Sequence, residues 1–129
     1  MPREYPVVLL VDDHADTAAM YAICLMAMGF QPVTTDSSDD GFERACRLQP
    51  DVVVADVQAG GSGLELARRL REDARTRATG IIVLTGDGFS SLKKKARAVG
   101  CDRLILKPCL PDALALQIRD VLNQRQDAE

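Results

Sequence analysis

The sequence predicts an α/β fold in which five parallel strands form one sheet with helices on both faces. Two observations predict it. Short apolar runs alternate with longer amphipathic segments five times along the chain, and most of these runs are apolar without interruption, as in strands buried on both faces. Such alternation is typical of a parallel sheet. Right-handed crossovers leave few topologies, and we expect the doubly wound strand order 2-1-3-4-5.

The expected strands differ in how clearly the sequence marks them. Val7–Val11 (VVLLV) is a continuous apolar run, and Gln31–Thr35 is short and rich in β-branched residues. Val52–Ala55 (VVVA) and Ile81–Leu84 (IIVL) are again wholly apolar, and Leu104–Leu106 is the fifth strand. Each is therefore expected in a buried sheet.

A helix is expected after each strand, over residues 16–28, about 38–48, about 64–72, 90–99 and 111 to about 123. Gly29 ends the first helix, Ser37 or Ser38 caps the second, and Pro50 stops it. Helical spacing predicts the side chains that face the core: Ala19, Ile23, Met26 and Ala27, then Phe42, Ala45 and Cys46, then Leu66 and Leu70, and finally Ala113, Leu114, Ile118 and Leu122.

Length and composition indicate one domain. The chain has 129 residues, of which 47% are apolar and 27% charged, and it lacks Trp, so the core must be largely aliphatic. We expect a single domain over 1–129, with its core over about 6–123. The polar segment 124–129 is expected to fray.

The charge balance argues against a nucleic-acid-binding module. The net charge is -3, whereas such modules need a basic surface. The arginines between 68 and 77 have no interleaved aromatic residues, and the lysines at 93–95 are interpreted as a solvated helix face.

The cysteines and the apolar runs predict a cytoplasmic protein. The four cysteines form no CxxC pair and His14 is the only histidine, so a zinc site is disfavoured and free buried thiols are expected. No apolar run approaches the ~20 residues that span a bilayer, and the N-terminus is unlike a signal peptide. No membrane insertion is expected.

Polar side chains follow four of the five predicted strands. Asp12 and Asp13 follow the first strand, Asp56 the third, Thr85 the fourth and Lys107 the fifth. Ligands of such sheets bind at the carboxyl ends of the strands, where the strand order reverses. Because the first and third strands are neighbours there, three carboxylates should meet in one cleft.

These residue types together predict phosphoryl-transfer chemistry. Three carboxylates in one cleft repel each other, and a hard divalent cation such as Mg²⁺ relieves that repulsion. Lys107 adds a positive charge and Thr85 a hydroxyl donor. A carboxylate nucleophile, a metal, a cation and a hydrogen-bond donor are the components that such a reaction needs.

The ordered set of an acidic pair, an Asp, a Thr and a Lys-Pro resembles the receiver domains of bacterial response regulators in two-component and phosphorelay signalling. The resemblance covers about residues 6–122, through VVLLVDDHAD, PDVVVADV, GLELARRLR, IIVLTG and KARAVGCDRLILKP. It implies a flavodoxin-like (βα)5 fold. It also implies a signalling switch that is not an enzyme beyond catalysing its own phosphorylation and hydrolysis.

The resemblance implies a role for each residue of the phosphoryl site. Asp56 would accept the phosphoryl group, and Lys107 would pair with Asp56 and then with the phosphoryl oxygens. Thr85 would reorient toward the phosphoryl group and carry Gly86 with it. The peptide between Lys107 and Pro108 would be cis, which proline allows at a cost of about 0.5–1 kcal/mol.

The resemblance also implies a metal and partners. Mg²⁺ (or Mn²⁺) would be bound by Asp13, Asp56 and the carbonyl of Gln58, with Asp12 acting largely through water. The donor would be a phosphohistidine on a sensor histidine kinase or a histidine phosphotransfer protein. The output would be a contact with an unknown protein or domain, or with a second copy of the chain, through residues 89–122.

Three features depart from the family or tune its chemistry. Leu104 stands where the family has a Phe or Tyr rotamer switch, three residues before the lysine. The loop over 58–63 looks one residue short and lacks the common Met-Pro pair. Gln58 and Asp87 lie two residues beyond Asp56 and Thr85, where we expect them to tune the lifetime of the phosphoryl group.

Other classes of protein fit the residues less well. An aspartyl-phosphate phosphatase needs a second acid where Gln58 stands, and the acidic segment 12–16 would repel a flavin phosphate. A pseudo-receiver that acts through protein contacts without phosphorylation is the remaining alternative. His14 is interpreted as a solvated loop residue.

Overall fold

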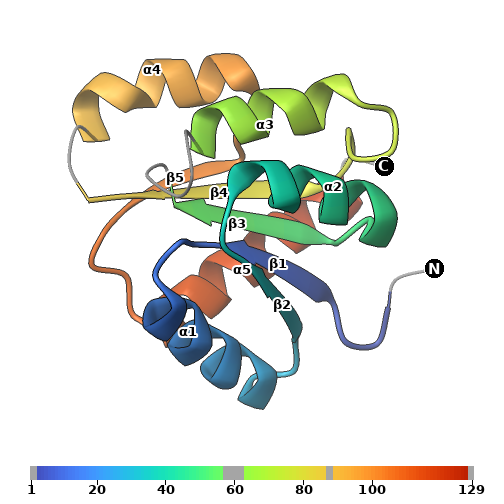
Figure 1. Cartoon of the computed structure of the whole chain (residues 1–129), viewed down its shortest axis with the longest axis vertical. Helices are drawn as coiled ribbons and strands as arrows, with labels where there is room; N and C mark the ends of the chain where they lie inside the picture. Colours follow the sequence, from blue (N-terminus) through green and yellow to red (C-terminus); the bar gives the residue numbers. More distant parts are fainter. Residues whose placement is uncertain (1–2, 57–62, 87–88, 128–129) are drawn as a thin grey trace.

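The computed structural model of the chain describes residues 3–56, 63–86 and 89–127, so Gln58, Asp87 and the loop that begins after Asp56 lie outside the described residues. Five parallel strands form one sheet in the order β2-β1-β3-β4-β5, which confirms the predicted fold class (Figure 1). The strands are β1 (Val7–Val11), β2 (Gln31–Thr35), β3 (Val52–Asp56), β4 (Gly80–Thr85) and β5 (Arg103–Leu106).

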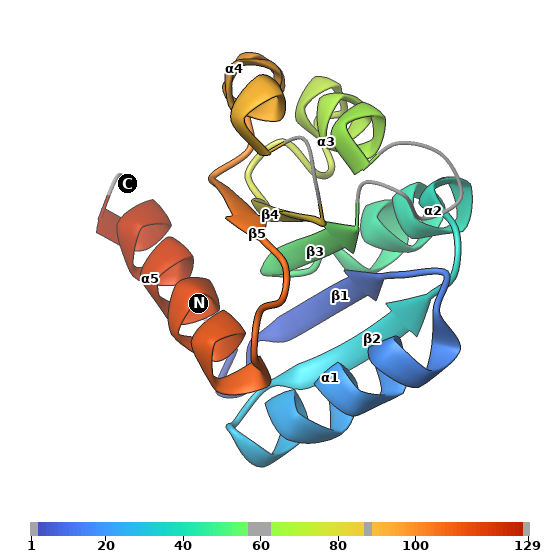
Figure 2. The same ribbon diagram turned by 90° about the vertical axis from the view of Figure 1, so that its left-hand side faces the viewer.

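Helices cover both faces of the sheet. They are α1 (Ala15–Ala27), α2 (Ser38–Leu48), α3 (Gly63–Glu72), α4 (Phe89–Val99) and α5 (Pro111–Asp127). α1 and α5 lie on one face, and α2, α3 and α4 lie on the other (Figures 1 and 2). Because successive strand residues point to opposite faces, Leu10 and Val54 join the core under α1 and α5, whereas Leu9 and Val53 join the core on the other face.

The N-terminus of α2 shows how the chain specifies its helix boundaries. Ser37 is the N-cap, and its side chain accepts a hydrogen bond from the Asp40 backbone N–H at 3.1 Å, which decides between the two serines that could cap this helix. The helix ends at Leu48, and the C-cap residue after it, Gln49, has a left-handed backbone with φ 48°.

Replacing Gln49 by Gly is expected to raise the free energy of unfolding by about 0.5 kcal/mol. A left-handed backbone destabilises the folded state of a non-glycine residue by roughly 1–2 kcal/mol, and glycine removes this strain. The greater flexibility of glycine in the unfolded chain cancels roughly 0.5–1 kcal/mol of that gain. Urea unfolding of Gln49→Gly and of Gln49→Ala measures the difference. An equal gain in both variants would contradict the explanation, because alanine keeps the strain.

The predicted inward face of the first helix is wrong. Ala18, Tyr21 and Leu25 are the buried residues of α1, whereas Ile23 is 71% exposed and Met26 is also exposed. Ala19 and Ala27 are exposed as well. Every residue from 18 to 27 is apolar, so the helical period alone does not define one face.

Two predictions about the last helix are also wrong. Ala113 is exposed, and the buried side chains include Leu114 and Ile118 as predicted, together with Ala115 and Val121. Residues 124–127 continue the helix, although a fraying tail was predicted there. Arg125 holds this end, because it donates to a carboxylate oxygen of Asp102 at 2.7 Å and to the Ala78 carbonyl at 2.9 Å.

Candidate functional site

Asp56 lies at the end of β3, in the middle of the sheet, with only 4% of its surface exposed. The Nζ of Lys107 donates to Asp56 Oδ2 at 2.5 Å. A buried carboxylate needs such a partner, since desolvation without one costs several kcal/mol. The structure therefore joins the ends of β3 and β5 through one ion pair.

The backbone around Lys107 is held by the neighbouring strand. Its N–H donates to the Thr85 carbonyl at 2.7 Å, one step beyond the last paired residues of β4 and β5. The peptide between Lys107 and Pro108 is cis. A Cβ at Gly86 would lie 3.6 Å from Lys107 Cε, so this glycine passes beside the lysine side chain.

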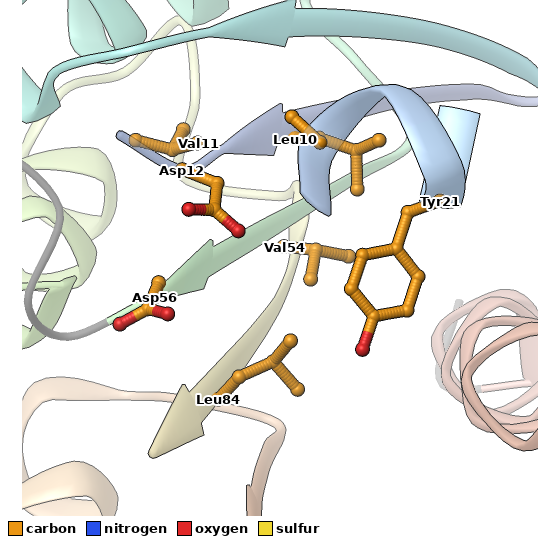
Figure 3. Close-up of a pocket in the computed structure, with 8 residues that line it drawn as sticks. Leu10, Val11, Asp12, Tyr21, Val54, Asp56 and Leu84 are labelled. Carbon is orange, nitrogen blue, oxygen red and sulfur yellow. The ribbon is translucent and has the colours of Figure 1, made fainter. Parts of the chain in front are cut away.

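Asp12 and Asp56 share a cavity. A small cavity between β1, β3 and α1 is lined by Asp12, Asp56, Tyr21 and aliphatic side chains. Figure 3 shows the two carboxylates on one side of it, and the Tyr21 ring on the other. A larger cleft of about 620 Å³ is lined by Asp12, Asp56 and Lys107, together with Pro108 and Leu110.

Asp13 lies next to His14 and is not among the residues that line the two cavities. The Nδ1 of His14 is 3.0 Å from Asp13 Oδ1 and 3.3 Å from Asp12 Oδ1, although the ring is 67% exposed. One ligand atom from each of these three residues lies within 4.8 Å of the others. The carboxylates are hard oxygen donors, so they fit a divalent cation of the Mg²⁺ or Mn²⁺ type.

Sequence reasoning missed the contact of His14 with the acidic pair. The only available signal was its position, directly after the two aspartates and before the first residue of α1. A ring attached there lies close to both carboxylates while it stays solvated.

Thr85 and Leu104 lie at the edge of this arrangement. Thr85 is fully buried at the end of β4, and it is not among the residues that line the two cavities. Leu104 is half-buried, pairs with Val83 in the sheet, and packs on the face that α3 covers. The structure therefore brings Asp12, Asp56 and Lys107 into one cleft, and Thr85 contacts this group through its backbone bond to Lys107.

Tyr21 is a second residue that sequence reasoning missed. It is 6% exposed on α1, and its hydroxyl donates to the Cys109 carbonyl at 2.5 Å. Burial, followed by the charges of Cys109, Asp12 and Asp56, raises the pKa of this hydroxyl. The available signal was a tyrosine inside an otherwise apolar helical segment.

The basic residues form ion pairs with acidic neighbours. Arg68 pairs with Glu65 and Glu72, and Arg69 pairs with Asp39. Arg71 and Arg75 are paired as well. The pairs of Arg68, Arg69 and Arg71 therefore offset much of the positive charge on α3.

The cysteines are free thiols, and only Cys46 is buried. Cys24, Cys101 and Cys109 are half-buried, which corrects the prediction that all four are buried. Burial raises the pKa of Cys101 to about 12, so its thiol stays protonated at neutral pH. Within the described residues, no helix is both long enough and apolar enough to cross a membrane.

Comparison with known proteins agrees with this architecture. The family "Response regulator receiver domain" matches residues 8–119. The phosphate regulon transcriptional regulatory protein PhoB of Pseudomonas aeruginosa is 33% identical over 118 residues, which cover 91% of this chain and 52% of that protein. The polar-differentiation response regulator DivK of Brucella ovis is 26% identical over 102 residues, covering 78% of this chain and 83% of DivK.

A solved structure shows the same fold. Chemotaxis response regulator CheY4 of Vibrio cholerae superposes with a TM-score of 0.84 at 25% identity, covering 91% of this chain and 98% of that one. This chain spans about half the length of the PhoB relatives that it matches, 52% for the Pseudomonas protein. Since the family match extends over most of the chain and the strand order agrees, the chain belongs to the response regulator receiver domains of two-component signalling.

Proposed function

We propose that this receiver domain accepts a phosphoryl group on Asp56 from a phosphohistidine and thereby changes a protein–protein contact. The proposal rests on the environment of the Asp56 carboxylate. It is buried, it lies 2.5 Å from the ammonium of Lys107, and it shares a cleft of about 620 Å³ with Asp12. A carboxylate in such a cleft is a suitable nucleophile for phosphoryl transfer.

The proposed reaction moves one phosphoryl group between two covalent carriers. A carboxylate oxygen of Asp56 forms a P–O bond while the P–N bond of the phosphohistidine breaks. The imidazole leaves with the electron pair of that bond and takes a proton from solvent. Lys107 offsets the negative charge on the phosphoryl oxygens, and the product is an acyl phosphate on Asp56.

Asp12, Asp13, Asp56 and Gln58 would hold the metal. Asp13 and Asp56 would bind it directly, together with the carbonyl of Gln58, and Asp12 would act largely through water. A bound Mg²⁺ or Mn²⁺ would offset the charges of the carboxylates and of the phosphoryl oxygens. We further propose that Gln58 and Asp87 tune the lifetime of the phosphoryl group.

Phosphorylation would change the contact surface through residues at the ends of β4 and β5. Thr85 would turn its hydroxyl to the phosphoryl group, Gly86 would follow, and Leu104 would repack in place of an aromatic switch. The face made by residues 89–122 would then contact an output protein, an output domain or a second copy of the chain. Exposed apolar side chains on this face, Leu106 and Leu116, suit such a contact.

Incubation with acetyl phosphate and Mg²⁺, followed by intact mass spectrometry, tests the proposal. Wild type is expected to gain one phosphoryl group only when Mg²⁺ is present, and Asp56→Asn is expected to gain none. Asp16→Asn, at an exposed position in the first turn of α1, is the matched control and should behave as wild type. An adduct on Asp56→Asn would place the site elsewhere, and no adduct on any variant would favour a pseudo-receiver.

A further inference from the structure

The Tyr21 hydroxyl connects α1 to the segment after β5, and both contribute residues to the cleft that holds Asp56. Tyr21 comes from α1, which follows the acidic pair, and its partner Cys109 lies two residues after Lys107. The hydroxyl donates to the Cys109 carbonyl at 2.5 Å. Both Tyr21 and Cys109 line the same cleft as Asp56 and Lys107.

The segment from Lys107 to Leu110 has few other anchors among the described residues. β5 lies at the edge of the sheet and pairs with β4 alone, through Leu106. Beyond it, the Lys107 N–H donates to the Thr85 carbonyl, and the next backbone bond, from Leu114 to Leu110, belongs to the start of α5. Leu110 is exposed. The hydrogen bond from Tyr21 is therefore the polar tie to α1 that the described residues show for this segment, beside the apolar packing of Cys109.

Packing alone does not account for a hydroxyl group at position 21. The Tyr21 ring lies among apolar side chains, including Val54, Leu84 and Leu114, where a phenylalanine ring would pack as well. A buried hydroxyl is tolerated only if it is hydrogen-bonded, and an unpaired one costs roughly 1–3 kcal/mol. The Tyr21 hydroxyl therefore adds one polar contact, to the backbone carbonyl of Cys109, two residues after Lys107.

We propose that Tyr21 is a positioning residue for phosphoryl transfer: its hydrogen bond to the Cys109 carbonyl holds the segment that carries Lys107, so that the Lys107 ammonium stays on the Asp56 carboxylate. This inference rests on the proposed function. A misplacement of about 1 Å in a catalytic group costs up to roughly 100-fold in rate. Loss of one hydrogen bond that positions Lys107 should therefore lower the phosphorylation rate measurably.

The test compares Tyr21→Phe with Tyr5→Phe, which removes the hydroxyl of the only other tyrosine, an exposed one. The phosphorylation rate with acetyl phosphate and saturating Mg²⁺ is measured at a temperature where circular dichroism shows every variant to be folded. Tyr21→Phe is expected to slow the reaction about tenfold, while its Mg²⁺ dissociation constant, measured by calorimetry, stays within about twofold of wild type. Tyr5→Phe should match wild type in both.

A double-mutant cycle separates positioning from a merely structural role. If Tyr21 acts through Lys107, Tyr21→Phe should slow the reaction no further in a Lys107→Met background. Fully additive effects would overturn the inference, and so would a rate for Tyr21→Phe within about twofold of wild type.

A readout that does not depend on phosphorylation keeps the two proposals distinguishable. Hydrogen exchange of the Lys107 amide, followed by NMR, should become about tenfold faster in Tyr21→Phe but not in Tyr5→Phe. If wild type accepts no phosphoryl group, the proposed function fails. Faster exchange of the Lys107 amide in Tyr21→Phe would still show that the Tyr21 hydroxyl holds the segment after β5. Unchanged exchange of that amide would overturn it.

Discussion

Replacement of Asp102 by alanine is expected to lower the free energy of unfolding by about 3 kcal/mol, because it removes one member of a largely buried ion pair. Asp102 precedes β5 and its side chain is 20% exposed. Its Oδ2 accepts from Arg71 at 3.0 Å and from the Ile81 N–H at 2.8 Å, and its Oδ1 accepts from Arg125 at 2.7 Å. One carboxylate thus joins α3, β4 and α5.

The substitution leaves Arg71 and Arg125 without the Asp102 carboxylate that both contact. Burial, followed by the charge of Arg125, lowers the pKa of Arg71, whereas Asp102 acts in the opposite direction. Without Asp102, the two guanidiniums repel each other, and the Ile81 N–H at the start of β4 loses the side-chain acceptor that it has in the native structure.

Asp120→Ala provides the matched control for this prediction. Asp120 also pairs with an arginine, Arg103, but the Asp120 side chain is 57% exposed. Such exposed pairs contribute about 0–1 kcal/mol. Urea unfolding followed by circular dichroism measures both variants, and equal losses for Asp102→Ala and Asp120→Ala would show that burial of the cluster contributes nothing.

Replacement of Lys107 by methionine is expected to slow phosphorylation of Asp56 about 100-fold, the effect of removing one fixed donor from a site where negative charge develops. Methionine keeps much of the length and apolar stem of lysine while removing the ammonium that lies 2.5 Å from Asp56 Oδ2. The rate of acyl-phosphate formation with Mg²⁺ and acetyl phosphate, followed by intact mass, measures the loss.

Lys95→Met is the control for the change in charge, because Lys95 is an exposed residue of α4. Its rate should stay within about twofold of wild type, since Lys95 does not line the cleft and an exposed charge is screened by salt. If Lys107→Met reacted as fast as Lys95→Met, the role proposed for the ammonium would be wrong.

The sheet could be predicted because three of its strands, β1, β3 and β4, carry a clear signal. Runs such as VVLLV and VVVA are apolar at every position, short and rich in Val, which favours strands covered on both faces over buried helices. Once the strand order is known, residues directly after the strands must gather at one edge. The placement of Asp12, Asp56 and Lys107 in one cleft followed from that geometry.

The remaining features depend on contacts between distant segments. The apolar residues of α1 occupy its whole circumference, so their pattern did not show that Ile23 faces solvent. Arg125 looked like part of a polar tail because its partner, Asp102, lies far away in sequence. Tyr21 and Cys109 are 88 positions apart, and nothing local to either residue indicates that bond.

The position of Tyr21 also gives the domain a built-in optical probe. The chain has no Trp, so its tyrosine fluorescence is not masked by Trp and comes from Tyr5 and Tyr21. In Tyr5→Phe, all of this emission would come from one ring that shares a small cavity with Asp12 and Asp56 (Figure 3). Steady-state fluorescence of that variant would therefore follow events at these carboxylates in real time, with no dye attached and no residue of the cleft altered.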